Sequence, residues 1–379
     1  MAKHKKRILI AFGTRPEALK LVPLIRSLRS SKDFECLVCL TGQHRQMLDQ
    51  VIDFFNIKIN DDLRLMKTNQ SLEYVSGRVV AGFGKIIDKT KPDLVFVQGD
   101  TATALMVGIA SFYAKVPIAH LEAGLRTWKK FTPFPEEINR KLLTHLADIH
   151  FTPTKSATQN LLHEGISKSY IFQAGNTIVD TVRIAASNIK KTYPIFQDVD
   201  LNKKILFVTA HRRESFGRGL KLIFTAFKQI IKSFPNAEIV YPVHLNPNVL
   251  QTAHKMLQGI ERIHLLRPLT YEETFWIMQK CYAILTDSGG IQEEAPSFKK
   301  PVLVLREVTE RPEGVRAGIA KVVGTDPFRI FNAMQDLFLK PKVYKRMIAK
   351  RNPYGDGHAA EHILNNLRQA FRLKLLGRH

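Results

Sequence analysis

The sequence predicts an α/β protein made of two doubly wound domains, each a parallel sheet with helices on both faces. Three observations support this fold class. The chain has 379 residues, which is more than one hydrophobic core usually supports. Short apolar runs alternate with longer amphipathic segments, as strands and helices do along a parallel sheet. This alternation fades over residues 189–202 and then starts again.

The first half of the chain contains apolar runs typical of buried strands, each followed by a turn. They lie at Arg7–Phe12, Phe34–Leu40, Asp93–Gln98 and Pro117–Leu121. Amphipathic segments between and after them predict helices at Pro16–Ser30, Gln46–Phe55, Leu72–Lys89 and Thr101–Lys115. This order predicts a first domain over residues 1–190.

The second half repeats the pattern. Strand-like runs lie at Ile205–Thr209, Glu238–Val243, Ile263–Leu266, Ala283–Thr286 and Pro301–Leu305, and helical segments at Leu220–Ser233, Tyr271–Lys280 and Phe328–Leu339. They predict a second domain over 203–356, and a helical pattern over 357–379 is expected to cross back onto the first domain. Because ligands of doubly wound sheets bind beyond the carboxyl ends of the strands, we expect the two domains to face each other across a cleft.

The chain is strongly basic. It contains 57 Lys and Arg against 34 Asp and Glu, a formal net charge of +23. These residues are spread along the chain without an arginine-rich tail or a basic strand with interleaved aromatics, so no nucleic-acid partner is expected. No apolar stretch approaches the ~18 residues of a membrane span, and the apolar run after the basic start is too short for a signal peptide. We expect a cytoplasmic protein without a membrane partner, whose charge reflects a basic surface or an acidic small substrate.

Two of the three cysteines form a C-x-x-C pattern, which raises the question of a redox or zinc site. Cys36 and Cys39 lie within the apolar run Phe34–Leu40. Residues three apart on a strand point to opposite faces, and a zinc site needs more ligands than these two. We therefore expect reduced core thiols, and no metal site.

Two cations follow the first predicted strand, at the start of a helix. Arg15 and Lys20 flank Pro16, a residue suited to a first helical turn. The dipole at a helix N-terminus disfavours cations, so the arrangement makes sense if an anion binds there. The alternative is that both are solvated surface charges.

Carboxylates follow three further predicted elements of the first half. Asp100 follows the strand that ends at Gln98, Glu122 ends the next strand, and Glu136 and Glu137 open a helix. Asp100 has an alternative role as a helix N-cap. Glu136 and Glu137 have an alternative role as acids in a first helical turn, where they complement the helix dipole. Three carboxylates at one end of a sheet nevertheless favour acid–base chemistry.

The second half carries features of a phosphate site. His211 lies at a strand end beside two arginines, and the run Ser288–Gly290 joins a strand to a helix. Backbone amides of such a turn can approach a phosphate closely. Glu294 lies one turn further on, within reach of ribose hydroxyls, and Arg306, Arg311 and Arg316 follow the next strand. Neither a G-x-G-x-x-G fingerprint nor a Walker A loop is present.

Eight segments together resemble the non-hydrolysing UDP-N-acetylglucosamine 2-epimerases. They are Phe12–Ala18, Gly99–Thr101, Glu122–Arg126, Pro133–Glu137, His211–Glu214, Asp287–Ala295, Thr309–Glu313 and Asn352–Gly357. The likeness runs in order through nearly the whole chain. It implies a two-domain fold of the GT-B type, a homodimer, and interconversion of UDP-GlcNAc with UDP-ManNAc. The missing dinucleotide and metal motifs predict that the reaction needs no cofactor, and we expect it to proceed by loss and re-addition of UDP.

The resemblance also assigns roles to individual residues. The diphosphate and ribose positions match Arg15, Ser288, Gly289, Gly290, Glu294 and Arg311, and the catalytic positions match Lys20, Asp100, Glu122, Glu136 and His211. A second, regulatory UDP-GlcNAc site matches Gln43, Gln46, Arg212 and His244. Some members have an arginine where this chain has Lys67–Asn69, which weakens the match at the regulatory site. Leu269 stands where at least one member has a glutamine near the uracil, so contacts to the base are expected to differ.

Alternatives to this reaction keep parts of the same site. A GT-B glycosyltransferase would share the diphosphate site but require an acceptor, and a hydrolysing epimerase would release free ManNAc and UDP. A third enzyme would act on a related UDP-diacetamido sugar. A protein that only binds a nucleotide sugar is disfavoured by the three carboxylates.

Overall fold

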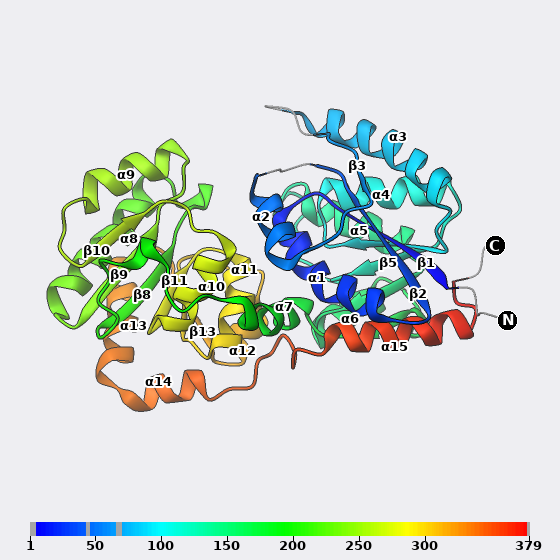
Figure 1. Cartoon of the computed structure of the whole chain (residues 1–379). Coiled ribbons are helices and arrows are strands. Elements are labelled where there is room, and N and C mark those ends of the chain that lie inside the picture. The colour runs from blue at the N-terminus through cyan, green and yellow to red at the C-terminus, as the bar shows by residue number, and fades with distance from the viewer. Residues whose placement is uncertain (1–4, 43–45, 66–69, 377–379) are drawn as a thin grey trace. The chain divides into compact units, whose positions relative to one another are not determined.

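The computed structural model describes residues 5–42, 46–65 and 70–376, without the side chains of residues 46 and 47. The chain divides into two compact units. The first comprises residues 1–184 and 354–379, and the second comprises residues 185–353. Both are α/β units with parallel sheets (Figure 1), so the fold class expected from the sequence is confirmed.

The first unit holds a sheet that is seven-stranded within the described residues, in the order β3-β2-β1-β4-β5-β6-β7. Its strands are β1 (Lys6–Phe12), β2 (Phe34–Leu40), β3 (Asp61–Asp62), β4 (Leu94–Gln98), β5 (Ile118–Leu121), β6 (Ile149–Thr152) and β7 (Ile171–Gln173). Its helices are α1 (Arg15–Ser30), α2 (Gln46–Phe55), α3 (Leu72–Thr90), α4 (Ala102–Tyr113), α5 (Glu136–Leu146), α6 (Lys155–His163), α7 (Thr177–Ala185) and α15 (Ala359–Arg372).

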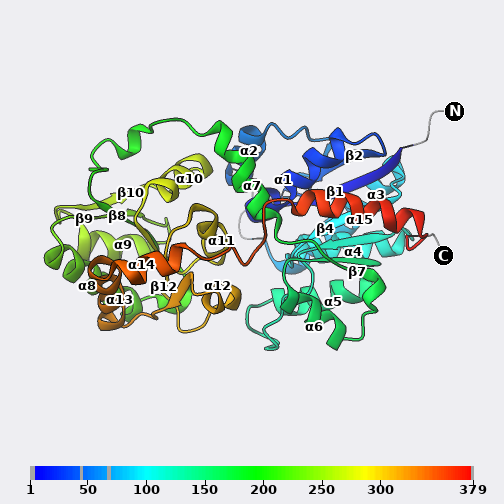
Figure 2. The ribbon, with the colours of Figure 1, turned by 90° about the horizontal axis from the view of Figure 1, so that it is seen from below.

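Helices cover both faces of this sheet because its central strands are apolar on both sides. Every residue of β4 is buried, and Val95 and Val97 pack against α3 and α4. Helix α1 covers the opposite face, and α15 lies beside it (Figure 2). Strand order reverses between β1 and β4, the position at which doubly wound sheets bind ligands at the carboxyl ends of their strands.

The second unit holds a sheet that is six-stranded in the described part of the chain, in the order β10-β9-β8-β11-β12-β13. Its strands are β8 (Lys204–Thr209), β9 (Ala237–Pro242), β10 (Ile263–Leu266), β11 (Ala283–Thr286), β12 (Val302–Val304) and β13 (Ala320–Val322). Its helices are α8 (Arg218–Ser233), α9 (Pro247–Leu257), α10 (Tyr271–Lys280), α11 (Gly289–Glu294), α12 (Pro312–Arg316), α13 (Pro327–Leu339) and α14 (Pro341–Ile348).

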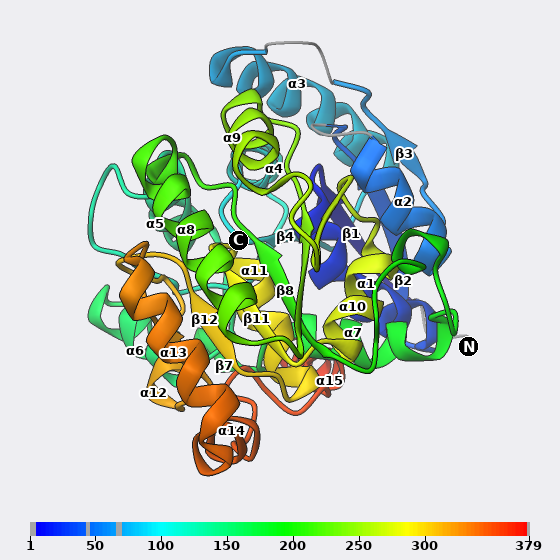
Figure 3. The same ribbon diagram turned by 90° about the vertical axis from the view of Figure 1, so that its left-hand side faces the viewer.

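Alternate residues of these strands enter two separate cores. Leu206 and Val208 pack with α8, α9 and α13 on one face, whereas Ile205 and Phe207 pack with α10 on the other. Figure 3 shows helices on both sides of this sheet. The sequence-predicted residues of this unit lie in the segments that follow β8, β9, β11 and β12.

Candidate active site

The carboxyl edge of the first sheet holds a buried ion pair. Lys20 projects from α1, and its Nζ lies 2.6 Å from Oε1 and from Oε2 of Glu122, which follows β5. Only 10% of the Lys20 side chain and 8% of the Glu122 side chain are exposed. The side-chain amide of Gln98, at the end of β4, also donates to Glu122. Lys20 is therefore not a solvated surface charge.

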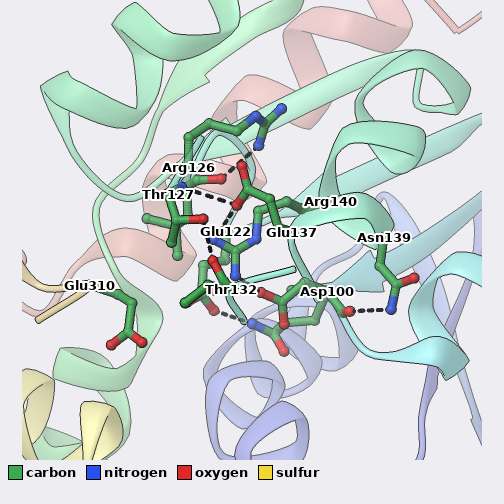
Figure 4. A network of polar contacts seen from close by, with 12 residues as sticks. Asp100, Glu122, Arg126, Thr127, Thr132, Glu137, Asn139, Arg140 and Glu310 are labelled. Carbon is green, nitrogen blue, oxygen red and sulfur yellow. Dashed lines mark hydrogen bonds and ion pairs between the residues drawn. The ribbon is translucent and has the colours of Figure 1, made fainter. Parts of the chain in front are cut away.

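Asp100 lies on the neighbouring turn of the same edge (Figure 4). Its Oδ2 is 2.6 Å from Nη2 of Arg140, and its side chain is 27% exposed. The alternative role as N-cap of α4 is wrong, because Thr101 is the cap and its hydroxyl accepts from the amide of Ala104 at 3.0 Å. The Asp100 carboxylate is thus directed toward α5 and partly open to solvent.

Helix α5 carries both glutamates of the motif that ends at Glu137. Glu136 is the first residue of the helix and is half-buried. Glu137 is fully buried and accepts from the backbone amides of Thr127 and Trp128, each at 3.0 Å. The two adjacent acids therefore have different environments: Glu137 is fully buried and holds the preceding loop, whereas Glu136 is half-buried at the start of the helix.

A buried glutamate joins the turns after β1 and β4. Glu17 accepts from the amides of Gly13 and Thr14 at 2.9 and 2.8 Å, and its other oxygen accepts from the Thr101 hydroxyl at 2.6 Å. Burial raises the pKa of Glu17, although these hydrogen bonds oppose the rise. The half-buried Arg15 lies on the segment that Glu17 fixes.

In the second unit, His211 is held by a buried aspartate. Asp287 is 1% exposed, and its Oδ2 accepts from the amides of His211 and Arg212 at 2.5 and 2.7 Å. Its Oδ1 lies 3.1 Å from Nδ1 of His211. Burial opposes ionisation of Asp287, but the hydrogen bonds and charge of His211 outweigh it, so the pKa of Asp287 is lowered.

The residues of the second unit that were expected to hold the diphosphate and ribose lie close together where α11 begins. A Cβ added to Gly289 would lie 3.9 Å from the Arg311 guanidinium, and one added to Gly290 would lie 3.9 Å from both Glu294 and Ser288. Arg311 is also paired with the buried Glu293. The five residues predicted here from the sequence therefore form one group, and Glu293 orients its arginine.

Of the residues assigned to a regulatory site, two are described with their side chains. The ring of His244 stacks on that of His211, with centroids 5.5 Å apart and planes 10° from parallel. Burial, and then the charge of His211, lower the pKa of His244. The Arg212 amide binds Asp287. Gln43 and the side chain of Gln46 lie outside the described residues.

Comparison with known proteins identifies the family. The model of the UDP-N-acetylglucosamine 2-epimerase family matches residues 26–368. The chain belongs to this family. A UDP-N-acetylglucosamine 2-epimerase of Campylobacter jejuni is 47% identical over 372 residues, 96% of this chain and 97% of the relative. The family consists of isomerases, so the chain is an enzyme.

Solved structures agree over nearly the whole chain. A UDP-GlcNAc 2-epimerase from Neisseria meningitidis bound to UDP-GlcNAc is 41% identical, with a TM-score of 0.90, covering 96% of this chain and 100% of that one. An S. aureus MnaA–UDP co-structure is 44% identical, with a TM-score of 0.89 and 98% and 97% coverage. These relatives confirm the resemblance found in the sequence and the GT-B type of the fold.

Sequence reasoning missed several residues that hold the site together. Asp287, Glu17, Asn139 and Arg140 all belong to or directly follow the segments that carry the resemblance. Reading the helix that Glu136 opens for one more turn would have found Asn139 and Arg140. Among the described residues, no three His, Cys, Asp or Glu side chains are grouped to hold a metal ion. No helix in the described ranges is long and apolar enough to cross a membrane.

Proposed function

We propose that this enzyme catalyses the reversible, non-hydrolysing epimerisation of UDP-GlcNAc at C2 to give UDP-ManNAc. The observation that carries the proposal is the set of carboxylates on one sheet edge. Glu122 is paired with Lys20, and Asp100 lies on the next turn. Relatives named UDP-GlcNAc 2-epimerase match the chain along almost its whole length.

The chemistry of the sugar explains why carboxylates are needed. C2 bears a hydrogen but has no adjacent carbonyl, so simple enolisation is not available. A carboxylate takes the C2 proton as the C1–oxygen bond breaks, and UDP leaves with the bonding electrons. The product is 2-acetamidoglucal, with a double bond between C1 and C2. Return of a proton to the opposite face, with re-addition of UDP, gives the epimer. Two faces require acid–base groups on two sides.

We assign this proton transfer to Asp100, Glu122 and Glu136, with Lys20 holding Glu122. Charge develops on the diphosphate as UDP departs, and cations and amides placed beforehand stabilise such charge. We assign this role to Arg15, His211, Arg311 and the amides of Ser288–Gly290, and the ribose to Glu294. Two buried acids support the assignment, since Glu293 pairs with Arg311 and Asp287 with His211.

Proton NMR with UDP-GlcNAc in deuterated water tests the proposal. We expect UDP-ManNAc that carries deuterium at C2, because the carboxylate exchanges its proton with solvent between the two steps. Activity should survive EDTA, since the proposed steps use only side chains and amides. Free ManNAc with UDP would instead indicate a hydrolysing enzyme, and product without deuterium would exclude the mechanism. No conversion without an added acceptor would favour a glycosyltransferase.

We further propose that UDP-GlcNAc activates the enzyme through Gln43, Gln46, Arg212 and His244. The stacking of His244 on His211 supports this, because it brings the ring that we propose for regulation into contact with the ring that we propose for catalysis. UDP-ManNAc alone should then be converted slowly, and a small addition of UDP-GlcNAc should accelerate it. A hyperbolic reverse reaction indifferent to UDP-GlcNAc would contradict this regulation.

We also propose a homodimer. Two large side chains at the end of α4, Phe112 and Tyr113, are 59% and 71% exposed, and exposed apolar surface of this kind is typical of subunit interfaces. Light scattering should give a mass close to twice 43.2 kDa. A monomer at the concentrations used for activity would contradict the proposal.

A further inference from the structure

Asp100 is held by two consecutive residues of α5. The side-chain amide of Asn139 donates to the backbone carbonyl of Asp100 at 2.8 Å, and Nη2 of Arg140 lies 2.6 Å from Oδ2 of its carboxylate. Each of these α5 residues is 6% exposed. One helix therefore fixes both the main chain and the side chain of the same acid, as Figure 4 shows.

Arg140 is itself anchored at its other terminal nitrogen. Nη1 lies 3.4 Å from Oε2 of Glu137, which is fully buried. That carboxylate is in turn held by the backbone amides of Thr127 and Trp128. A guanidinium is a rigid planar fork, so contacts at both ends leave Arg140 little freedom to rotate.

The Asp100 turn is also held from the side of the sheet. Nε2 of His120, on β5, lies 2.7 Å from the carbonyl of Gly99. A carbonyl only accepts, so Nε2 carries the hydrogen. Burial lowers the pKa of His120 to about 4, so the ring is neutral at pH 7 and donates this bond without adding a charge beside Asp100. The positions of Gly99 and Asp100 are thus fixed from two directions.

We propose that Asn139 and Arg140 are positioning residues for this reaction, which orient the Asp100 carboxylate toward C2 of the sugar. This inference rests on the proposed function, in which Asp100 exchanges a proton with C2. A misplacement of about 1 Å in a reacting group can cost on the order of 10²-fold in rate. Asn139 and Arg140 act through Asp100, so their loss alters the proton transfer and leaves the binding of UDP intact.

Steady-state kinetics of Asn139→Ala and Arg140→Lys test the proposal. For each variant kcat should fall by roughly 10- to 100-fold, whereas KM for UDP-GlcNAc and the Kd for UDP should change by less than about threefold. Lysine keeps the charge of Arg140 but lacks the planar fork that contacts Asp100 and Glu137 through two separate nitrogens. Arg262→Lys is the matched control, since the Arg262 guanidinium donates to the carbonyls of Ile231 and Phe234 in the second unit. This control should keep wild-type kcat.

A double-mutant cycle separates positioning from a general structural role. In an Asp100→Asn background, Asn139→Ala should reduce kcat by less than about twofold further, because the group that it positions is already gone. Multiplying effects would overturn the inference, as would wild-type kcat in both single variants. If the wild-type chain forms no UDP-ManNAc, the proposed function fails and this inference falls with it. If the wild type is active and the cycle is additive, only the inference fails.

Discussion

At the scale of single residues, Lys20 and Glu122 form a buried ion pair, and we propose a catalytic role for its carboxylate. The pair is almost completely buried, and its carboxylate is bound by Nζ through both oxygens. Removing one partner of such a pair leaves an uncompensated buried charge, which costs about 3–5 kcal/mol, whereas replacing both partners is often nearly neutral. Stability and activity should therefore respond differently to single and double substitutions.

This difference gives the first prediction. Glu122→Gln should lose about 10²- to 10⁴-fold in kcat, the usual contribution of one acid–base group. It should also lower the free energy of unfolding by a few kcal/mol, because Lys20 remains buried without its counter-charge. The double variant Lys20→Met/Glu122→Gln should regain much of the stability and none of the activity. Denaturant unfolding and NMR turnover assays measure the two effects. Recovery of turnover in the double variant would disprove the catalytic role.

The second prediction concerns the pH dependence of the Asp287–His211 contact. The pKa of Asp287 is lowered in the folded state, so its ionised form favours folding above its ordinary pKa of 3.8. This contribution is lost as the pH falls through the lowered folded-state pKa. Compared with Asp287→Asn, the wild-type protein should be more stable at neutral pH, and the difference should shrink as the pH falls below about 4. Thermal melting from pH 3 to pH 7 checks this, and a difference independent of pH would contradict it.

The residues expected from the sequence differ from the missed ones in a physical way. Asp100 and Glu122 follow strands of the first sheet and His211 follows a strand of the second, and within each sheet the ends of parallel strands meet at one edge. Arg140 reaches Asp100 only because α5 lies against the turn after β4. The sequence shows Arg140 one turn beyond Glu136, but the side chain that it contacts depends on tertiary packing.

At the scale of elements, β2 places the C-x-x-C pattern inside a buried strand. Cys36 and Cys39 are free and buried on this strand, as expected from the sequence. Burial raises the pKa of each thiol to about 12. The reactive form is the thiolate, and it is scarce at such a pKa.

The third prediction follows from this burial. The folded protein should resist alkylation by iodoacetamide at pH 8 at Cys36, Cys39 and Cys281, the last of which is also buried with its pKa raised to about 12. After unfolding in guanidinium chloride, all three should react within minutes. Mass spectrometry of tryptic peptides measures the modified fraction. Rapid labelling of the C-x-x-C pair in the folded protein would reopen the redox interpretation.

Several elements with a strong apolar pattern were predictable, whereas two short strands with polar residues were not. The ranges expected for β2, α2, β10, α10 and β11 coincide with the structure. Strand β3 consists of two aspartates, and β6 has a buried histidine at its second position, so neither has the apolar run of a core strand. These strands form because neighbouring strands offer hydrogen-bond partners, which is a tertiary effect.

At the scale of the whole molecule, the chain builds its first unit from two separate segments. Residues 354–379 belong to the same unit as residues 1–184. The amide of Asn176 donates to the Tyr354 carbonyl at 2.8 Å, and the buried Asp180 accepts from the first two amides of α15 at 3.1 and 2.9 Å. Further along the helix, Arg368 pairs with Asp33 at 2.8 Å. The last helix is therefore an integral part of the first unit, which also contains Asp100, Glu122 and Glu136.

The fourth prediction is that removing α15 destabilises the first unit. Ile363 and Leu367 are completely buried, and burying such a side chain contributes about 1.5–3 kcal/mol. Removing α15 loses the burial of these side chains and also exposes the face of α1 that they cover. The free energy lost is comparable to the ~5–15 kcal/mol net stability of a whole domain. A chain that ends at Pro353 should therefore melt at a clearly lower temperature than the wild type, or accumulate unfolded. A chain that ends at Leu376 is the matched control, because it keeps the whole helix and the buried Leu376, and should melt like the wild type. Circular dichroism distinguishes the two truncations. Equal melting temperatures would show that α15 rests on the first unit without stabilising it.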